Sequence, residues 1–200
     1  MDQRLLQVGQ GKDLRFARVS LTFEPELRAD VFALKNNKTV AQTLTHPRYA
    51  GLLSVNPPEH QTALHSPLGD FLARMKAEGD LTYRRFLNKH GDLEYRTFQT
   101  ADPRYLGSMG VYAYFVGDDL KYVGRCKDSM KKRINNGYGK IHPKNCYLDG
   151  QSTNCHLNAL IAPLRESVSL WLCVLKADEV NAIELELIAQ YRPAWNVMHP

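Results

Sequence analysis

The clearest alternation of apolar and polar positions lies in the C-terminal half of the chain. Residues 111–116 (VYAYFV) and 120–123 (LKYV) are rich in β-branched and aromatic side chains, and the turn residues 117–119 (GDD) separate them. This pattern predicts a β-hairpin. Residues 168–175 (VSLWLCVL) are almost all apolar, which predicts a third strand that is buried on both faces.

The hairpin brings tyrosines together. If its turn is symmetric about Asp118, Tyr114 lies opposite Tyr122, and Tyr112 lies opposite Gly124. Side chains alternate between the two faces of a strand, so the three tyrosines share one face of the sheet. Such a cluster is common as plain packing, and it also suits a site that uses phenol groups.

Three helices are expected around these strands. The first is capped by Asp128 and runs to about Asn135, with Gly137 as its stop. The second begins at Ser152 or Thr153, and the third covers residues 178–191.

The N-terminal half has a mixed and less regular pattern. Alternation over residues 15–23 predicts a half-buried strand, and apolar residues at helical spacing over 68–78 predict a helix that Gly79 ends. Residues 82–98 favour a hairpin that turns at 90–92. The chain as a whole is therefore expected to have an α+β fold with an N-terminal mixed α/β extension.

The last helix carries a carboxylate in its apolar stripe. At about 100° per residue, Glu184 lies in the middle of a stripe formed by Val180, Ile183, Leu187, Ile188 and Tyr191. Burial of an ionised carboxylate costs several kcal/mol unless a cation or hydrogen bonds compensate it. Glu184 therefore needs a partner, and a divalent metal ion and an arginine are both open.

Composition places the chain among ordinary folded proteins. Hydrophobic residues make up 44% and charged residues 24%, which argues against a disordered or fibrous class. No stretch approaches the ~18 consecutive apolar residues of a membrane span, and the N-terminus lacks a signal-peptide pattern. We expect a cytoplasmic protein with no membrane partner, whose four scattered cysteines are free thiols.

Positive charge is concentrated in one segment. The formal net charge is +5, and residues 121–144 contain eight basic residues against one acid, Asp128. A basic segment suits an anionic partner such as nucleic acid, although charged runs are often only solvated faces.

Five short elements occur in a fixed order along the C-terminal half: Gly110-Val111-Tyr112, Tyr122-Val123-Gly124, Arg133, Glu184, and Pro193 with Asn196. This ordered set resembles the signature of the GIY-YIG endonuclease family, and the run from Glu184 to Asn196 (ELELIAQYRPAWN) is especially similar. The resemblance covers residues 108–200.

The resemblance implies a nuclease domain over residues 108–200, with a small three-stranded antiparallel sheet flanked by helices. It implies hydrolysis of DNA with one Mg²⁺ ion held by Glu184, for which Mn²⁺ is a substitute. Residues 1–107 show no resemblance to a known family, so DNA recognition and dimerisation are both open roles for them.

By position in the motif, Tyr122 is expected to be the phenol near the attacking water, with Tyr112 beside it. Arg133 is expected to clamp a phosphate, and Asn196 is a supporting polar residue. A tyrosine with a pKa of about 10 is a poor base at neutral pH. Either nearby cations, Arg125 and Arg133, favour its phenolate, or a water molecule relays the proton.

Two positions depart from the family pattern. Arg125 follows the second triplet where many relatives have lysine, and Gly137 lies where many have a tyrosine or histidine four residues after the helix arginine. Tyr138 and His142 are the alternatives for that missing side chain, with Tyr138 preferred. The remaining nucleic-acid contacts are expected from Lys127, Lys131, Lys132, Lys140 and His142.

Three functional interpretations follow. The first is a restriction or defence endonuclease, which would act as a homodimer to cut both strands of a palindrome. The second is a structure-specific nuclease of DNA repair or recombination. The third is a nucleic-acid-binding module without catalytic turnover.

Overall fold

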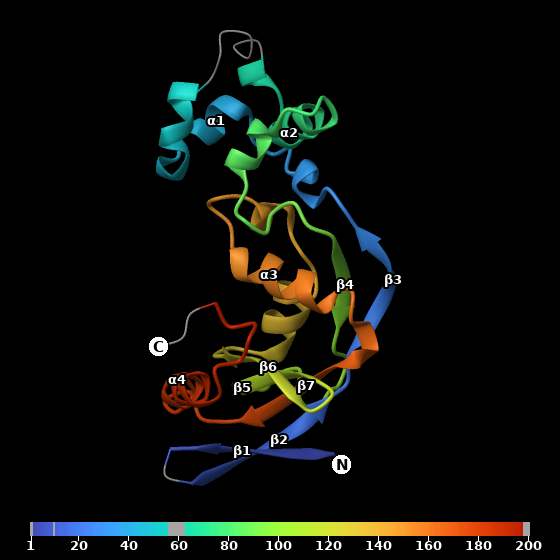
Figure 1. Ribbon diagram of the computed structural model, residues 1–200, viewed down its shortest axis with the longest axis vertical. Helices are drawn as coiled ribbons and strands as arrows, with labels where there is room; N and C mark the ends of the chain where they lie inside the picture. Colours follow the sequence, from blue (N-terminus) through green and yellow to red (C-terminus); the bar gives the residue numbers. More distant parts are fainter. Residues whose placement is uncertain (1, 10, 56–62, 198–200) are drawn as a thin grey trace. The chain divides into compact units, whose positions relative to one another are not determined.

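The computed structural model describes residues 2–9, 11–55 and 63–197, and these form an α+β fold (Figure 1). The strands are β1 (Gln3–Val8), β2 (Lys12–Val19), β3 (Thr22–Arg28), β4 (Tyr95–Gln99), β5 (Gly110–Val116), β6 (Asp119–Cys126) and β7 (Val168–Val174). The α-helices are α1 (Val40–Leu44), α2 (Leu68–Ala77), α3 (Ser152–Ile161) and α4 (Val180–Tyr191). None of the helices in the described part of the chain has the length and apolar character that crossing a lipid bilayer requires.

Two sheets organise the strands. A five-stranded antiparallel sheet has the order β1-β2-β7-β5-β6, and β3 pairs with β4 in a two-stranded sheet. The predicted α+β class and the three predicted strands of the C-terminal half are thus confirmed. The expected sheet of three strands was too small, because β2 pairs with the outer edge of β7 and β1 extends the sheet further.

The chain folds as two compact units. The first contains residues 1–25, 96–140 and 160–200, and the second contains residues 26–95 and 141–159. These units differ from the expected division at residue 107. The physical reason is that the N-terminal hairpin completes the five-stranded sheet, whereas residues 141–159 pack into the core of the second unit.

The β5–β6 hairpin has the predicted register. Tyr114 lies opposite Tyr122, and Tyr112 lies opposite Gly124. The turn itself is not symmetric about Asp118, because Val116 pairs with Asp119 and leaves a two-residue turn. A bulge of one residue between the pairs of Tyr114 and of Phe115 restores the predicted alignment.

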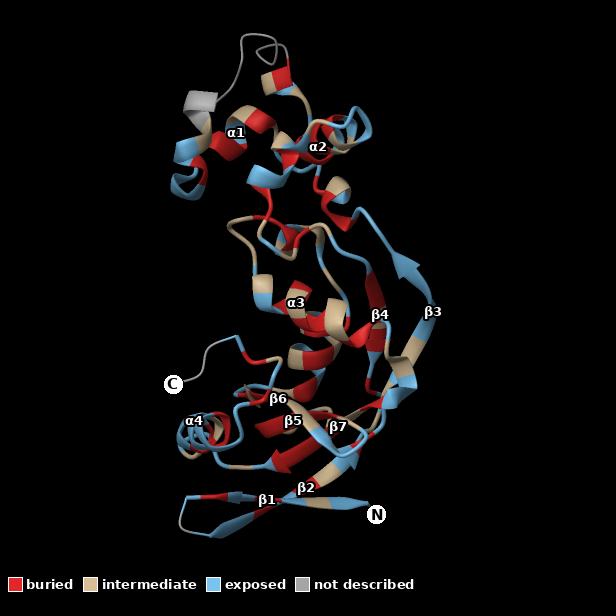
Figure 2. Ribbon diagram, viewed as in Figure 1, coloured by how far each residue is buried: buried red, intermediate tan, exposed pale blue. Residues whose placement is uncertain are grey.

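One face of the large sheet packs against α4. Val111, Ala113 and Phe115 of β5 face α4, and they form one apolar cluster with Leu187 and other residues of that helix. The strand predicted over residues 15–23 ends at Val19 as β2, and Phe16 joins the same cluster. Figure 2 shows how completely β5 and β7 are buried in comparison with the outer strand β1.

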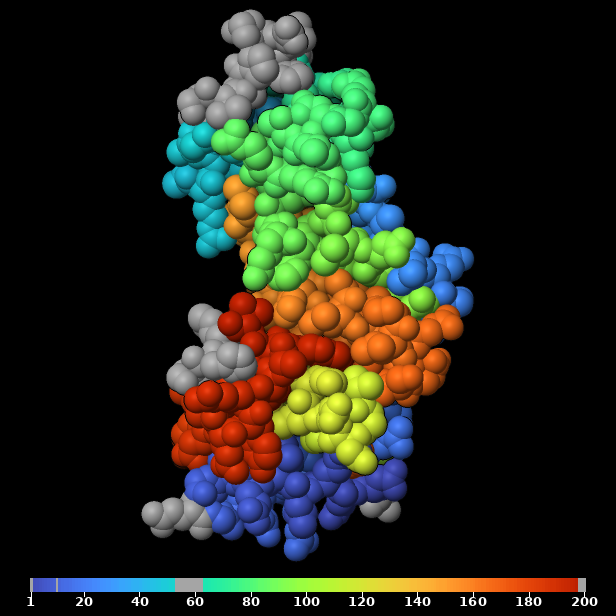
Figure 3. Space-filling model, in the orientation of Figure 1, coloured from blue at the N-terminus to red at the C-terminus, as the bar shows by residue number. Residues whose placement is uncertain are grey.

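The N-terminal hairpin also contacts α4 directly. The backbone N–H of Gln7 donates a hydrogen bond of 3.0 Å to the hydroxyl of Tyr191, and the blue and red surfaces adjoin in Figure 3. Tyr191 was expected in the buried stripe of the helix, but it is 37% exposed. Its position at the last turn leaves the ring beside the edge strand rather than beneath the sheet.

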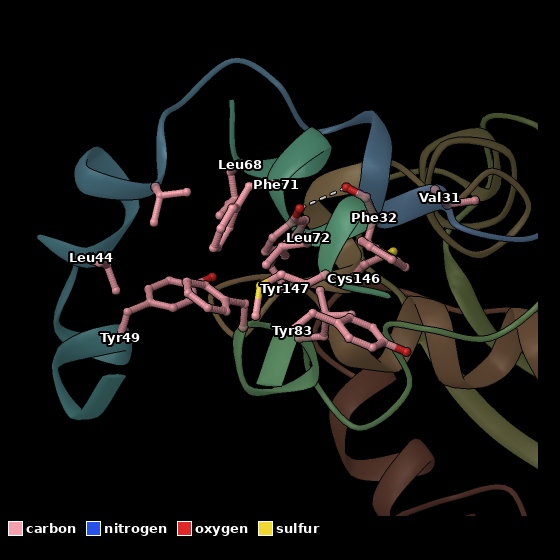
Figure 4. Packing of buried hydrophobic residues seen from close by; sticks show 14 of the residues in the cluster. Val31, Phe32, Leu44, Tyr49, Leu68, Phe71, Leu72, Tyr83, Cys146 and Tyr147 are labelled. Carbon is pink, nitrogen blue, oxygen red and sulfur yellow. Dashed lines mark hydrogen bonds between the residues drawn. The ribbon is translucent and has the colours of Figure 1, made fainter. Parts of the chain in front are cut away.

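The second unit has a separate core, which Figure 4 shows. The predicted helix over 68–78 is α2, and Gly79 follows its end with a positive φ of 80°. The hairpin predicted over 82–98 was wrong: Leu81–Phe86 is the 3-10 helix η4, and β4 pairs with β3 instead. The side chain of Asp80 caps η4. Tyr83 and Phe86 are three residues apart, so they lie on the same side of this 3-10 helix, and both are buried.

If the N-terminal hairpin is an integral part of the large sheet, its buried side chains must stabilise the whole unit. Phe16→Ala should lower the free energy of unfolding by about 3–5 kcal/mol, because Phe16 is 0% exposed and its removal leaves a cavity. Leu5→Ala is the control on the same hairpin, where Leu5 is 60% exposed and a change below about 0.5 kcal/mol is expected. Urea unfolding measures both. Equal stability of Phe16→Ala and the parent protein would show that the hairpin is dispensable.

Candidate active site

Four tyrosines form a buried cluster in the first unit. Tyr112 and Tyr114 come from β5, Tyr122 from β6, and Tyr138 from the helix η5 (Lys131–Tyr138). The ring centroid of Tyr112 lies 6.0 to 6.2 Å from those of the other three. Tyr112, Tyr114 and Tyr138 are fully buried, whereas Tyr122 is 7% exposed. Tyr122 is therefore the member of the cluster with access to solvent.

Gly124 makes room for this cluster. A Cβ atom at Gly124 would lie 2.6 Å from the hydroxyl of Tyr112 and 2.6 Å from the ring of Tyr122. Because Tyr112 lies opposite Gly124 in the register, its ring crosses over the glycine backbone. The hairpin pattern already predicts that Tyr112 lies opposite Gly124, and the structure adds the steric reason for a glycine there.

The helix η5 is a π-helix, with i→i+5 hydrogen bonds such as the 2.6 Å bond from the N–H of Gly139 to the carbonyl of Ile134. The α-helix expected between its cap at Asp128 and about Asn135, with Gly137 as its stop, is corrected accordingly. Its N-cap is Met130, and its last residue is Tyr138. A nearby hydroxyl still assists its first turn, because Ser129 Oγ accepts a hydrogen bond from the N–H of Lys132.

The π-helix brings Arg133 and Tyr138 together. With i→i+5 bonding the turn is wider than in an α-helix, which brings residues five apart onto the same side of the helix. Arg133 and Tyr138 are such a pair, and the guanidinium of Arg133 lies 4.8 Å from the ring centroid of Tyr138. The phenol that contacts Arg133 therefore belongs to the residue five positions after it, and Gly137, four positions after it, has no side chain.

Arg133 connects the tyrosines to a basic pocket. Its Nε donates a hydrogen bond of 3.2 Å to the hydroxyl of Tyr112, and that hydroxyl donates one of 2.7 Å to Tyr138. No ion pair within 4 Å involves Arg133 among the described residues. The guanidinium borders a pocket of about 420 Å³ lined by Arg125, Cys126, Lys127, Asp128, Ser129, Lys132 and Arg133.

Burial keeps the four phenols neutral. Loss of solvent raises the pKa of Tyr112, Tyr114 and Tyr138 well above the usual value and also raises the pKa of Tyr122. The charge of Arg133 lowers these pKa values, but burial is the larger effect. Of the two routes left open for Tyr122, the phenolate is therefore disfavoured, and a neutral hydroxyl that donates and accepts remains.

Glu184 has an arginine partner. Nη1 of Arg125 donates a hydrogen bond of 2.5 Å to Oε2 of Glu184, whose side chain is 12% exposed. Burial raises the pKa of Glu184, while Arg125 and, less strongly, Arg133 lower it. The other oxygen, Oε1, has no hydrogen bond within the described residues. Glu184 can therefore keep its arginine and still offer an oxygen to a cation.

Asn196 holds the free edge of β6. Its side-chain amide exchanges two hydrogen bonds with the backbone of Val123, 2.8 Å from Nδ2 to the carbonyl and 3.0 Å from the N–H to Oδ1. The N–H of Trp195 adds a bond of 2.8 Å to the carbonyl of Lys121. Because Val123 lies between Tyr122 and Gly124, Asn196 acts as a positioning residue for the tyrosine cluster.

The predicted nucleic-acid contacts divide into three groups. Lys127 and Lys132 line the basic pocket. Lys131 and Lys140 are exposed in the first unit but do not line it. His142 belongs to the second unit, where its Nδ1 accepts a hydrogen bond of 3.2 Å from the N–H of Lys144. Of the two alternatives for the missing side chain, Tyr138 is the one that joins the tyrosine cluster.

One hydroxyl of the cluster, that of Tyr114, has an environment that the sequence did not predict. The hydroxyl of Tyr114 is buried and has no hydrogen-bond partner within the described residues. Its place next to Tyr112 and Tyr122 follows from the alternation of β5. The lack of a partner depends on tertiary packing, which no local pattern reveals.

No protein-family model matches this chain, and neither does any curated protein or solved structure. The chemistry of the described side chains therefore carries the functional assignment.

The hydrogen-bond chain can be tested with two conservative variants. Tyr112→Phe removes the acceptor of Arg133 Nε, so it should cost about 1–3 kcal/mol of unfolding free energy. Tyr114→Phe removes a buried hydroxyl without a partner in the described structure, so stability should stay the same or increase. Urea unfolding compares them. Equal losses in both variants would mean that the hydroxyls of this cluster are energetically equivalent, contrary to the bonding described.

Proposed function

We propose that this chain is a Mg²⁺-dependent DNA endonuclease of the GIY-YIG type that hydrolyses phosphodiester bonds. One observation carries the proposal: the five side chains Tyr112, Tyr122, Arg133, Tyr138 and Glu184 come together from four separate elements. They are linked by hydrogen bonds and by the mutual effects of their charges. Simple core packing would not require a guanidinium and a carboxylate in this place.

The basic pocket suits a DNA phosphate. Arg133 is oriented by Tyr112 through Nε, and no carboxylate within 4 Å neutralises it in the described structure. An arginine fork can bind two phosphate oxygens at once and stays charged. Lys127 and Lys132 add positive charge on the wall of the same pocket, which favours the approach of a polyanion.

The residues present fit a magnesium ion that keeps most of its waters. Within the described residues no group of three histidine, cysteine, aspartate or glutamate side chains converges as a metal cage. Glu184 alone offers a carboxylate oxygen, and Mg²⁺ is often bound by one or two carboxylates together with waters and substrate phosphates. When bound, the ion supplies electrostatic stabilisation of the charge that develops on the phosphate oxygens.

Arg125 and Arg133 influence how such an ion binds. Both guanidinium groups lie close enough to affect the pKa of Glu184. Their positive charge opposes the binding of a cation in the free protein. A DNA phosphate beside Arg133 would make the charge around Glu184 more negative and so favour the cation. We therefore infer that DNA and the metal ion bind together, with DNA raising the affinity for the metal.

Tyr122 is suited to handle the proton of the attacking water. Tyr122 is the most exposed residue of the cluster, and its ring centroid lies 6.4 Å from that of Tyr138. A neutral phenol donates and accepts at the same oxygen. Tyr122 can thus accept a hydrogen bond from water while Tyr138 and Tyr112 connect it to the charge of Arg133.

A restriction or defence enzyme that acts as a homodimer is the setting we favour, and repair or recombination is the alternative. Cutting of both strands at a palindrome needs two copies of a one-site chain. Discrete fragments from a long DNA support the first setting, and cleavage that depends on branched DNA supports the second.

A nucleic-acid-binding module without turnover is a second candidate. The observation that favours it is the 2.5 Å pair between Arg125 and Glu184, which compensates the carboxylate without any metal. DNA binding without cleavage in Mg²⁺ or Mn²⁺ would select this candidate.

The central test uses supercoiled plasmid with Mg²⁺, with EDTA, and with Glu184→Gln. The parent protein should nick the plasmid, EDTA should abolish nicking, and Glu184→Gln should slow it by about 10²-fold or more, a loss of ~2.7 kcal/mol in transition-state stabilisation. Glu186→Gln is the matched control, since Glu186 is exposed on the same helix two residues away. Equal activity of the two glutamine variants would remove Glu184 from the reaction.

The role of Arg133 can be tested by keeping its charge and changing its shape. Arg133→Lys loses the Nε bond to Tyr112 and the two-pronged contact with phosphate. Nicking should fall by about 10²-fold, while Asn136→Ala, an exposed change on the same helix, should leave the rate unchanged. Full activity of Arg133→Lys would indicate that only a diffuse positive charge is needed at this position.

A further inference from the structure

Lys35 is a buried cation without a carboxylate partner. It is 7% exposed, and no hydrogen bond or ion pair of its side chain occurs within the described residues. Its ammonium group lies 4.7 Å from the ring centroid of Tyr147. A cation–π contact of this kind contributes only about 0.5–2 kcal/mol, and the ammonium nitrogen is not completely removed from solvent. An anion that reaches Lys35 from the solvent side would therefore gain a charge-assisted contact.

Asp149, the acid that acts on Lys35, already accepts a hydrogen bond from a tyrosine. Asp149 raises the pKa of Lys35, but its Oδ1 accepts a hydrogen bond of 2.6 Å from the hydroxyl of Tyr49. Burial is the largest influence and lowers the pKa of Lys35, and Lys38 and Lys144 lower it further. Asp149 thus compensates part of the charge of Lys35, while two further lysines add positive charge around it.

Lys35 borders a pocket of about 250 Å³ in the second unit. One wall is the segment after the 3-10 helix η1 (Val31–Leu34), and the other is the start of the 3-10 helix η6 (Pro143–Cys146). The hydroxyl of Tyr147 donates a hydrogen bond of 2.9 Å to the carbonyl of Phe32, which joins the two walls (Figure 4).

The groups that line this pocket suit a phosphate. Nδ1 of His142 accepts a hydrogen bond from the N–H of Lys144, so in the neutral ring Nε2 carries the proton and can donate it. Lys144 is exposed and makes no ion pair within the described residues. Asn37 is exposed and adds an amide donor. The residues that line this pocket thus include hydrogen-bond donors and lysines, and none of them is an aspartate or glutamate.

We propose that the pocket formed by Lys35, Asn37, His142 and Lys144 binds a phosphate group of the DNA backbone. The identity of the anion as DNA rests on the proposed function, whereas the pocket itself is independent of the catalytic cluster. The second unit is then a DNA-binding unit that contributes affinity through phosphate contacts.

The test measures binding of a fluorescent DNA duplex to the full chain by anisotropy, over a range of salt concentrations and in EDTA so that no cleavage occurs. Lys35→Met and Lys144→Ala should each weaken binding about tenfold at low salt and reduce the slope of log K against log salt by about 0.9. Lys89→Ala is the control, because Lys89 is an exposed lysine of the same unit that does not line the pocket.

Two further measurements keep the outcome decisive. Lys35→Met should unfold at the same or a higher temperature, since methionine retains the apolar stem and removes an unpaired charge. Inorganic phosphate should stabilise the parent protein against heat and leave Lys35→Met unchanged. Loss of folding in Lys35→Met leaves Lys144→Ala to decide between the outcomes.

Unchanged DNA affinity and salt slope in the pocket variants would overturn the inference. Binding of inorganic phosphate with no change in DNA affinity would also overturn it, because the pocket would then serve a free phosphate. A protein that fails to nick plasmid but loses affinity in Lys35→Met would refute the nuclease and leave the pocket intact. Nicking with full affinity in Lys35→Met would refute only the pocket.

Discussion

The close approach of Tyr112 to the backbone of Gly124 underlies the candidate site. The register of the β5–β6 hairpin places this pair opposite each other, and no side chain larger than hydrogen fits beneath the ring. Because the ring is held there, its hydroxyl reaches both Arg133 and Tyr138. Asn196 secures the same strand from its free edge. Backbone pairing in the sheet therefore orients a side-chain network whose own bonds are individually modest.

The first unit also pairs its largely buried carboxylate with a cation. The carboxylate of Glu184 is largely buried, and Arg125 neutralises it at 2.5 Å. Arg133 remains without a carboxylate within 4 Å in the described structure, beside phenols that burial keeps neutral. This arrangement keeps one guanidinium available for an anion while the acid remains stable. Under the proposed function, DNA supplies that anion, and the free oxygen of Glu184 becomes a ligand for the metal.

Lys35 in the second unit is also a charged side chain that is largely buried, but unlike Glu184 it has no ion pair within 4 Å in the described residues. Its ammonium group lies over the ring of Tyr147. Both units thus contain cations that burial makes costly and that an external phosphate would compensate. If both pockets bind DNA, the chain contacts its substrate through two separately folded units, which raises affinity by linking two binding events in one molecule.

Local patterns were sufficient to predict the β5–β6 hairpin, β7, α2 and the tyrosine face of the sheet, because alternation and turn residues act over a few positions. The buried Glu184 was also evident from helical spacing, although its partner was not: Arg125 lies 59 residues away in the chain. Pairing of β2 with β7, the π-helical register that joins Arg133 to Tyr138, and the failed hairpin over residues 82–98 depended on long-range packing. Such features are chosen by which surfaces meet in the folded chain, and residues adjacent in sequence do not encode that choice.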